Sequence, residues 1–193
     1  TDCRFGITAP YGVDGYDVNT LGVGSYLDWD MKTNPSRPGG IEYVQVVRLR
    51  DDLYFGMLAN LPEVAAAQPG AYWLVGNEPD TTYEDQDELY PEVYAQRYHD
   101  VYYAIKAADP TAKIGIGGIV QPTPVRMEYL DRMLAAYQSS YGTLPPADFW
   151  HIHGFILNEI NALWGTGMPP DSAARPYTAP PYNFTGDPSQ NAN

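Results

Sequence analysis

The sequence predicts an α/β protein whose strands form a parallel sheet. Short apolar segments, rich in β-branched and aromatic residues, alternate with longer segments of helical period. The apolar segments are bounded by Gly, Pro or Asp, and strands that alternate with helices indicate βα units. Two architectures fit: an open doubly wound sheet, or a (β/α) barrel whose last units are missing. The chain has no Gly-rich nucleotide-binding fingerprint and no P-loop, which disfavours the nucleotide-binding forms of the open sheet.

The sequence contains six predicted strands, all of them short. They are residues 4–8, 21–29, 43–49, 72–76, 113–118 and 148–155. The connections in the first half carry weaker signals than those in the second half. We expect a helix over residues 57–67, and loops at residues 12–20 and 32–40.

Two longer helices are predicted in the second half of the chain. Residues 91–109 carry apolar side chains at steps of three and four, and Pro91 suits the first helical turn. Residues 123–141 repeat the pattern, with Thr123 as the expected N-cap and Gly142 as the stop. Each of these helices therefore has one apolar face to pack on the sheet.

The composition excludes several classes of partner. The chain has 193 residues and a formal net charge of −13, and such an acidic surface repels nucleic acid and anionic membranes. No segment approaches the run of about 18 apolar residues that a membrane-spanning helix needs, so membrane insertion is not expected. A single cysteine, Cys3, leaves no intramolecular disulfide and no cysteine-rich zinc site. We predict no cofactor and no metal.

The sharpest local feature is the sequence WLVGNEPD at residues 73–80. An apolar strand runs directly into Asn77 and Glu78, which places Glu78 at the carboxyl end of a parallel strand. Active sites of parallel α/β folds are built at that end. A carboxyl group partly desolvated by an apolar strand and by aromatic neighbours suits the general acid of glycosidic cleavage. The alternative interpretation is that Asn-Glu-Pro forms a simple turn.

This segment resembles the acid/base motif of clan A glycoside hydrolases, TIM barrels with an Asn-Glu pair at the end of the fourth strand. The chain is most similar to the "glycosyl hydrolase catalytic core" group, which includes the family 128 endo-β-1,3-glucanases. Members of that group have an early strand that ends in aromatic residues, matched here by Tyr26 and Trp29. Their sixth strand carries a histidine followed by an aromatic residue, matched by His153 and Phe155. The resemblance covers residues 4–155.

The resemblance implies a fold and two residue roles. It implies an incomplete, TIM-barrel-like (β/α) barrel of about six βα units over residues 1–164. Residues 165–193, which are rich in Pro, Ser and Asn and lack periodicity, are predicted to be a tail or loop. Glu78 would be the acid/base residue, and Asn77 the partner of a sugar 2-hydroxyl group.

The chain departs from the family in the region of the nucleophile. Clan A enzymes carry a nucleophilic Glu at the end of the seventh strand. After the sixth predicted strand this sequence offers only Glu159, which has no strand of its own. A full barrel usually takes about 250 residues, so two βα units are missing. We expect either a fragment of a complete enzyme or a short barrel without the nucleophile.

Other candidate site residues lie at the ends of predicted strands. Trp29 is the tryptophan best placed to stack on a sugar ring, whereas Trp73 begins its strand and is expected in the core. Arg48 and Arg50 share one face at the end of the third strand, where they could bind a substrate hydroxyl, orient a carboxylate or form salt bridges.

Two further groups of residues have more than one interpretation. His151 and His153 share one face of a strand, so they suit a metal pair, a substrate contact by His153, or a structural role. The acidic segment at residues 80–88 is expected to be a solvated loop, since the spacing of a calcium-binding EF-hand is absent.

These observations lead to two functional predictions. The first is a secreted glycoside hydrolase-like protein that acts on a β-glucan-type polysaccharide by retaining chemistry, if a missing segment supplies the nucleophile. The second is a non-catalytic glycan-binding module, or an extracellular structural or assembly subunit, on a degenerate barrel. The abundance of Tyr, Pro and Gly favours an extracellular location. The expected partners are a polysaccharide or oligosaccharide, and either self-association or a protein that covers the open barrel edge.

Overall fold

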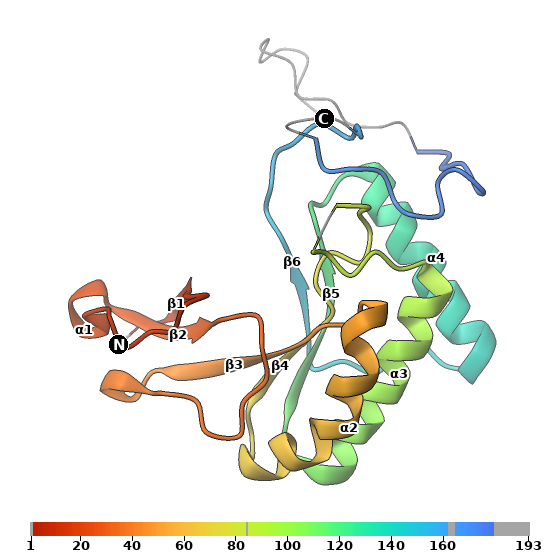
Figure 1. Cartoon of the computed structure of the whole chain (residues 1–193). Helices are drawn as coiled ribbons and strands as arrows, with labels where there is room; N and C mark the ends of the chain where they lie inside the picture. The colour runs from red at the N-terminus through yellow and green to blue at the C-terminus, as the bar shows by residue number, and fades with distance from the viewer. Residues whose placement is uncertain (1, 84, 162–164, 180–193) are drawn as a thin grey trace.

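The computed structural model describes residues 2–83, 85–161 and 165–179. Its strands form one sheet in the order β1-β2-β3-β4-β5-β6, and every neighbouring pair is parallel. The strands are β1 (Asp2–Thr8), β2 (Val23–Leu27), β3 (Glu42–Val47), β4 (Tyr72–Val75), β5 (Lys113–Ile119) and β6 (Phe149–Ile152). The sheet curls into an open half-barrel (Figure 1). The predicted incomplete (β/α) barrel is therefore confirmed, because a doubly wound sheet would reverse its strand order.

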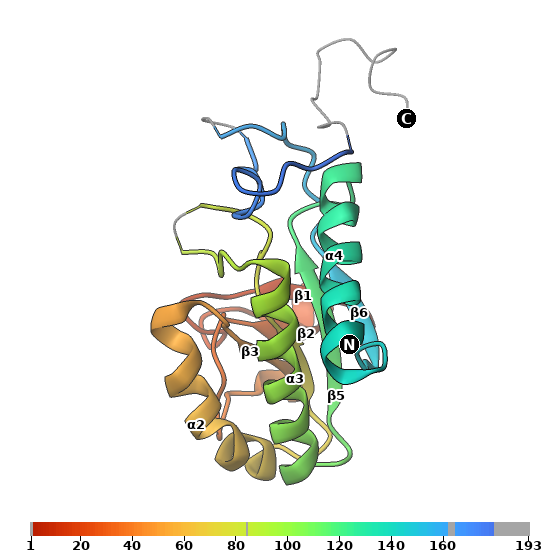
Figure 2. The same cartoon turned by 90° about the vertical axis from the view of Figure 1, so that its right-hand side faces the viewer.

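Three long helices lie side by side on the outer face of the later strands (Figure 2). They are α2 (Asp51–Ala67), α3 (Pro91–Ala108) and α4 (Pro124–Tyr141). The bounds of α3 and α4 match the prediction closely. The predicted start of α2 at residue 57 is wrong, because the helix already begins at Asp51. Asp51 and Asp52 occupy its first turn, where acidic side chains are favourable, and Gly56 is accommodated within it.

The connections after β1 and β2 contain only short helical turns. The segments predicted as loops include α1 (Val18–Leu21) and the 3-10 turn η1 (Pro38–Gly40). Asp17 caps α1 by accepting a hydrogen bond from the Thr20 backbone N–H at 3.1 Å. The β1–β2 half of the sheet therefore has a small core of its own around Val23, Tyr26 and Tyr43. Figure 1 shows this half turned away from the helix-covered strands.

Two predicted strands are longer than the observed ones by several residues. Residues 21–29 were expected to be extended, but β2 begins after Gly22, which has a left-handed φ of 67° as the C-cap of α1. It ends before Trp29, whose φ is 68°. Residues 148–155 were also expected to be one strand, whereas β6 covers only Phe149–Ile152. In both cases the side chains of interest lie just beyond the strand, at the carboxyl edge of the sheet.

The main core lies between the sheet and the three helices. Trp73 and Val75 of β4 are fully buried in this core, as predicted for Trp73. Tyr94 of α3 joins two strands, because its hydroxyl donates to the Val75 carbonyl at 2.9 Å and accepts from the Gly117 N–H at 3.0 Å. This links the ends of β4 and β5. Asn77 and Glu78 lie just after the end of β4.

The segment after β6 returns over α4. Within residues 165–179, which contain no helix or strand, Asp171 is fully buried and accepts hydrogen bonds from Arg132, Arg175 and Tyr177. In the described part of the chain, no helix is long and apolar enough to cross a membrane.

Candidate active site

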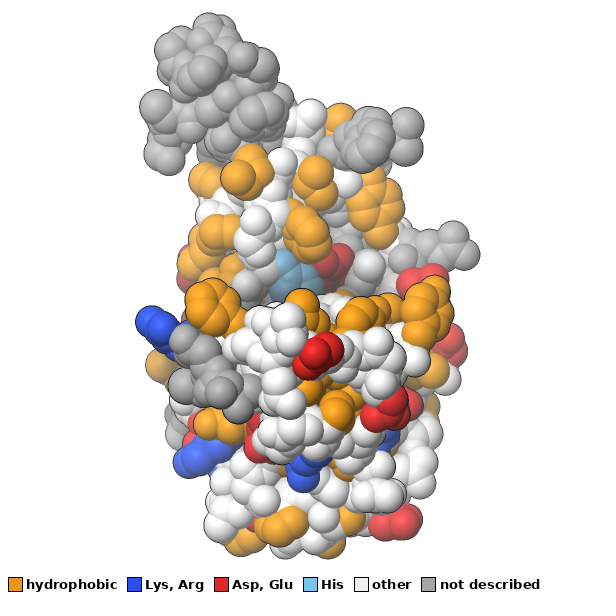
Figure 3. Space-filling model, turned by 90° about the vertical axis from the view of Figure 1, so that its left-hand side faces the viewer, with side chains coloured by type: hydrophobic (Ala, Val, Ile, Leu, Met, Phe, Trp, Pro, Cys, Tyr) orange, Lys and Arg blue, Asp and Glu red, His pale blue; other side chains and the backbone are white. Residues whose placement is uncertain are grey.

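A cavity of about 650 Å³ opens at the carboxyl ends of the strands. It is lined by Thr8, Leu27, Trp29, Val46, Arg48, Leu74, Gly76, Asn77, Glu78, Asp85, Gln86, His151, Ile152, His153 and Phe155. Strands β1, β2, β3, β4 and β6 contribute to this lining, either directly or through the segment that follows each of them. On this face of the molecule, histidine surface lies in a hollow with hydrophobic side chains around it (Figure 3). The cavity contains all the site residues predicted from the sequence: Glu78, Asn77, Trp29, His153 and Arg48.

Glu78 is held at the end of β4 in a constrained backbone conformation. Its φ is 48°, in the left-handed region that residues other than glycine seldom adopt. Its N–H donates to the Gly118 carbonyl at 2.7 Å, which ties it to the end of β5. Gly76, two residues earlier, allows the chain to pass against α3, since an added Cβ would lie 2.7 Å from the Tyr94 ring. Glu78 is 9% exposed, so its carboxylate faces the cavity from a mostly desolvated position.

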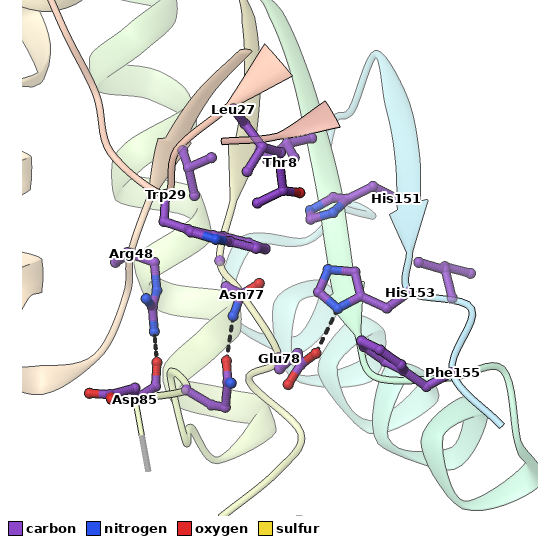
Figure 4. Close-up of a pocket in the computed structure, with 15 residues that line it drawn as sticks. Thr8, Leu27, Trp29, Arg48, Asn77, Glu78, Asp85, His151, His153 and Phe155 are labelled. Atoms are coloured by element: carbon purple, nitrogen blue, oxygen red, sulfur yellow. Dashed lines mark hydrogen bonds and ion pairs between the residues drawn. The ribbon is translucent and has the colours of Figure 1, made fainter. Parts of the chain in front are cut away.

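His153 is the direct partner of the Glu78 carboxylate. Its Nδ1 lies 2.7 Å from Glu78 Oε1 (Figure 4). An ionised carboxylate only accepts hydrogen bonds, so Nδ1 carries the proton in that state. The backbone N–H of His153 donates to the Ile119 carbonyl at 2.9 Å, which fixes the residue next to the end of β5. The structure therefore joins two candidates that are far apart in the sequence.

Aromatic side chains flank this pair on both sides. The Trp29 ring lies 6.5 Å from the His153 ring, edge-on, and the Phe155 ring lies 5.9 Å from it. In Figure 4 Trp29 extends across the cavity towards His153, and Phe155 borders Glu78. Flat apolar rings at this spacing suit contact with the CH faces of a pyranose ring.

Asn77 is fixed by the loop that follows β4. Its N–H donates to Asp87 Oδ2 at 2.7 Å, and its side-chain amide donates to Gln86 Oε1. Its Oδ1 is buried and has no hydrogen-bond partner among the described residues. Buried polar atoms without partners are rare in folded proteins, so this acceptor is available to a ligand that donates a hydrogen bond.

Arg48 lines the cavity, but its guanidinium group is already engaged. Its Nε donates to Asp87 Oδ1 at 2.8 Å, and its Nη2 donates to the Asp85 carbonyl. Asp87 also accepts from the Leu49 N–H at 3.0 Å. Of the interpretations offered for Arg48, a salt bridge is therefore the one observed. A direct contact with substrate stays a prediction.

The prediction that residues 80–88 form a solvated acidic loop is wrong for Asp80 and Asp87. Asp80 is 0% exposed and Asp87 is 2% exposed. Burial raises the pKa of Asp87, although the Arg48 charge opposes the shift. Asp87 positions Asn77, yet nothing in the acidic pattern distinguished it from its exposed neighbour Asp85. The basic partners of Asp80 and Asp87 come from distant segments, so composition alone could not identify them.

Glu159, considered as a second carboxylate, lies in a different environment. It is 2% exposed and does not line the cavity. Its Oε2 accepts from Arg126 Nη2 at 2.6 Å and from Thr166 Oγ1 at 2.9 Å, while its Oε1 accepts from Gln121 Nε2 at 2.7 Å. Burial opposes ionisation, but these bonds and the Arg126 charge together lower its pKa. Glu159 is therefore a structural anion.

Thr123 also belongs to this cluster. It was expected to cap α4, and it does occupy the N-cap position, but its hydroxyl makes no cap hydrogen bond. The hydroxyl donates instead to Glu159 Oε1. The Thr123 hydroxyl thus bonds a carboxylate that is distant in the sequence instead of capping its own helix. The sequence spacing could not predict this contact.

The two histidines do not form part of a larger set of metal ligands. The rings of His151 and His153 lie 6.4 Å apart, on the same side of β6. Within the described ranges, no group of three or more His, Cys, Asp or Glu side chains is arranged to hold a metal ion. His99, expected to be structural, stacks on Tyr141 with ring centroids 3.6 Å apart, away from the cavity.

The fold is similar to that of several solved glycoside hydrolases. A GH128 (subgroup II) endo-beta-1,3-glucanase from Sorangium cellulosum matches 77% of this chain at 23% identity, with a TM-score of 0.51. A GH128 (subgroup I) endo-beta-1,3-glucanase from Amycolatopsis mediterranei, in complex with laminaritriose, matches 82% at 17% identity, with a TM-score of 0.56. A variant of the latter enzyme in complex with laminaripentaose matches 77% at 18% identity, with a TM-score of 0.54.

The similarity concerns part of each enzyme. The matched regions are 59%, 59% and 56% of the lengths of those chains, so this chain spans less than two thirds of each. No protein-family model and no curated protein matches the sequence. At these identities the likeness shows the fold, and the resemblance predicted from the sequence is confirmed at that level. The chain is an incomplete (β/α) barrel whose fold is similar to that of these GH128 enzymes.

Proposed function

We propose that the chain is a secreted, glycoside hydrolase-like protein whose cavity binds a β-glucan-type polysaccharide, with Glu78 as the acid/base residue. The observation that carries the proposal is the Glu78–His153 pair, 2.7 Å apart, at the carboxyl ends of parallel strands between Trp29 and Phe155. The fold neighbours named as endo-beta-1,3-glucanases, one of them in complex with laminaritriose, favour a β-1,3-glucan as ligand.

Each side chain has a distinct part in the proposed reaction. His153 engages Oε1 of Glu78 and leaves Oε2 to face the glycosidic oxygen. Glu78 protonates that oxygen as the glycosidic bond breaks and a second carboxylate bonds to the anomeric carbon, and the resulting Glu78 carboxylate then activates a water molecule that displaces this second carboxylate. The unpartnered Oδ1 of Asn77 accepts a hydrogen bond from the sugar 2-hydroxyl group. Trp29 supplies the apolar face on which the ring rests.

Retaining chemistry also needs a second carboxylate about 5–5.5 Å from the first. The other carboxylate among the described cavity residues is Asp85, whose side chain is 85% exposed and paired with Arg50 at 3.0 Å. Its exposure and its salt bridge make it a poor nucleophile. In our proposal the nucleophile therefore comes from a segment that completes the barrel beyond β6.

The proposal is tested with laminarin and laminaritriose on the natural full-length protein. Reducing ends are measured for the wild type, for Glu78→Gln, and for Glu63→Gln on the outer helix α2 as the matched control. We expect Glu78→Gln to lower the rate by at least about 100-fold, because a positioned general acid contributes that much, and Glu63→Gln to leave it unchanged. Absence of both hydrolysis and oligosaccharide binding in the wild type would falsify the proposal.

One observation favours a second function. Because the described cavity lining holds no second buried carboxylate, the site also suits a non-catalytic glycan-binding module. Calorimetry would then give saturable laminaritriose binding without any release of reducing ends.

An extracellular assembly subunit is the further alternative, and the half-exposed Trp150 and Ile152 on the edge strand β6 favour a protein that covers this edge. Sedimentation of the protein without sugar would then reveal self-association.

A further inference from the structure

Strand β5 ends in a two-glycine bulge that makes room for His151. Gly117 and Gly118 have φ values of 124° and 71°, and the register with β6 shifts between Gly117 and Ile119. A Cβ added to Gly117 would lie 2.4 Å from the His151 carbonyl oxygen. One added to Gly118 would lie 2.9 Å from Cε1 of the His151 ring. The imidazole therefore lies in a slot beside Gly118, and Gly117 makes room for the backbone of the same histidine.

The His151 ring lines the cavity and leaves a buried nitrogen unpaired. Its Nε2 is shielded from solvent and has no hydrogen-bond partner among the described residues. In Figure 4 the ring points into the space bordered by Thr8, Trp29 and His153. The second cavity atom of this kind is Oδ1 of Asn77. Unpaired buried polar atoms are uncommon, and two in the wall of one cavity indicate a polar ligand.

The environment of His151 determines which ligand groups suit it. Burial, and then the neighbouring His153, lower its pKa to about 3, so the ring is neutral at ordinary pH. A neutral imidazole carries no charge and has one donor and one acceptor nitrogen. A hydroxyl group both donates and accepts, so it matches this ring in either tautomer.

We propose that His151 is a specificity residue that hydrogen-bonds a ring hydroxyl of the sugar unit lying between Trp29 and His153. His151 and Asn77 would together form hydrogen bonds with sugar hydroxyl groups on the Thr8 side of Glu78. This inference rests on the proposed glycan-binding function of the same cavity, and it adds a recognition role that neither the acid/base pair nor the aromatic walls provide.

The first test uses the wild-type protein and no variant. The chain has only three histidines, so ¹³C labelling of their Cε1 atoms gives three signals. Laminaritriose is titrated into the labelled protein. We expect the His151 and His153 signals to move and to saturate together, while the His99 signal on α3 stays in place. A stationary His151 signal beside a moving His153 signal would overturn the inference and leave the proposed function intact.

The second test compares two histidine variants by calorimetry with laminaritriose. His151→Phe keeps a flat ring and removes both nitrogens, whereas His99→Phe is the matched control outside the cavity. We expect His151→Phe to weaken binding by about ten-fold, as for the loss of one desolvated hydrogen bond, and His99→Phe to have no effect. Equal affinities of His151→Phe and the wild type contradict the inference alone. No binding by the wild type would contradict both this inference and the proposed function.

Discussion

Buried carboxylates anchor the loop that follows β4 near both of its ends. The two anchors differ in how many carboxylates share one arginine. Near β3, Asp87 faces one cation, Arg48, and accepts from two backbone N–H groups as well. At the other end, Asp80 lies 3.5 Å from Arg126, which Glu159 also contacts at 2.6 Å. One arginine thus serves two carboxylates, and all three side chains are fully buried.

This difference has a measurable electrostatic consequence. Glu159 has the shorter contacts with Arg126, and it keeps a lowered pKa although burial opposes this. Burial raises the pKa of Asp80 to about 6, because the shared Arg126 and its weak backbone contacts only partly compensate. The comparison shows that Glu78 and Asn77 are held between Asp87, which has an arginine of its own, and Asp80, which shares its arginine with Glu159. The following variants separate the two anchors.

The largest effect is expected from removing the shared cation. Arg126→Met leaves Asp80 and Glu159 buried without their cation, and breaking such a cluster costs about 3–5 kcal/mol. Arg132→Met is the matched control, since Arg132 also pairs with two carboxylates but keeps a partly exposed side chain. Urea unfolding should give a much larger loss of unfolding free energy for Arg126→Met. Equal losses would mean that the Arg126 cluster is not a special anchor.

The Asp87 anchor is expected to contribute somewhat less. Asp87→Ala leaves the N–H groups of Leu49 and Asn77 unpaired and removes the carboxylate partner of Arg48, whose side chain is only 11% exposed. We expect a loss of about 2–4 kcal/mol, and a smaller loss for Asp87→Asn, which keeps one acceptor oxygen. Laminaritriose affinity should fall for both variants, because Asn77 loses its support. If stability falls and affinity does not, Asp87 does not position the site.

Asp80 should show a distinctive dependence on pH. Its pKa is about 6 in the folded protein against 3.8 for an ordinary Asp, so its contribution to stability is present below pH 3.8 and is lost as pH rises through 6. Asp80→Asn does not titrate. The unfolding free energy of the variant relative to the wild type should therefore rise between about pH 4 and 7, on the order of 1–3 kcal/mol. A flat difference across this range would show that Asp80 is fully compensated.

The smallest effect is expected at the middle of the same loop. The Asp85 side chain is 85% exposed, and its salt bridge with Arg50 is screened by solvent. Asp85→Ala should leave the unfolding midpoint within experimental error. Hydrolysis of laminarin, where it is measured, should also persist. A loss of turnover with unchanged folding would instead identify Asp85 as the missing second carboxylate.

Sequence patterns predicted most of the helix-covered part of the fold. The apolar stripes of α3 and α4, with prolines at their starts, gave bounds close to the observed ones. The β1–β2 half was less predictable, because α1 and η1 are too short to show a periodicity. The ends of β2 and β6 were overestimated, since Trp29 and His153 continue an extended-looking pattern but follow the turn into the site.

The residues of the site also divide into those that the sequence predicted and those that it did not. Glu78 and Asn77 were identifiable because they directly follow an apolar strand, and local sequence specifies the end of a strand. The roles of Asp87, Arg126 and Glu159 were not, because each depends on partners more than 30 residues away. The spacing of acidic residues in a sequence does not show whether their carboxylates are solvated or paired with a buried arginine.

The sequence by itself determined the class of fold, the approximate positions of its strands along the chain and the position of Glu78 at the carboxyl edge of the sheet. These depend on hydrophobic periodicity and on residues that begin or end helices and strands, which act over a few residues. Only the tertiary structure decided that His153 contacts Glu78, that Asp80 and Asp87 of the acidic loop are buried, and that the His151 ring lies in a slot beside Gly118. These depend on contacts between distant segments, whose energies appear only when the sheet has curled and brought the strand ends together.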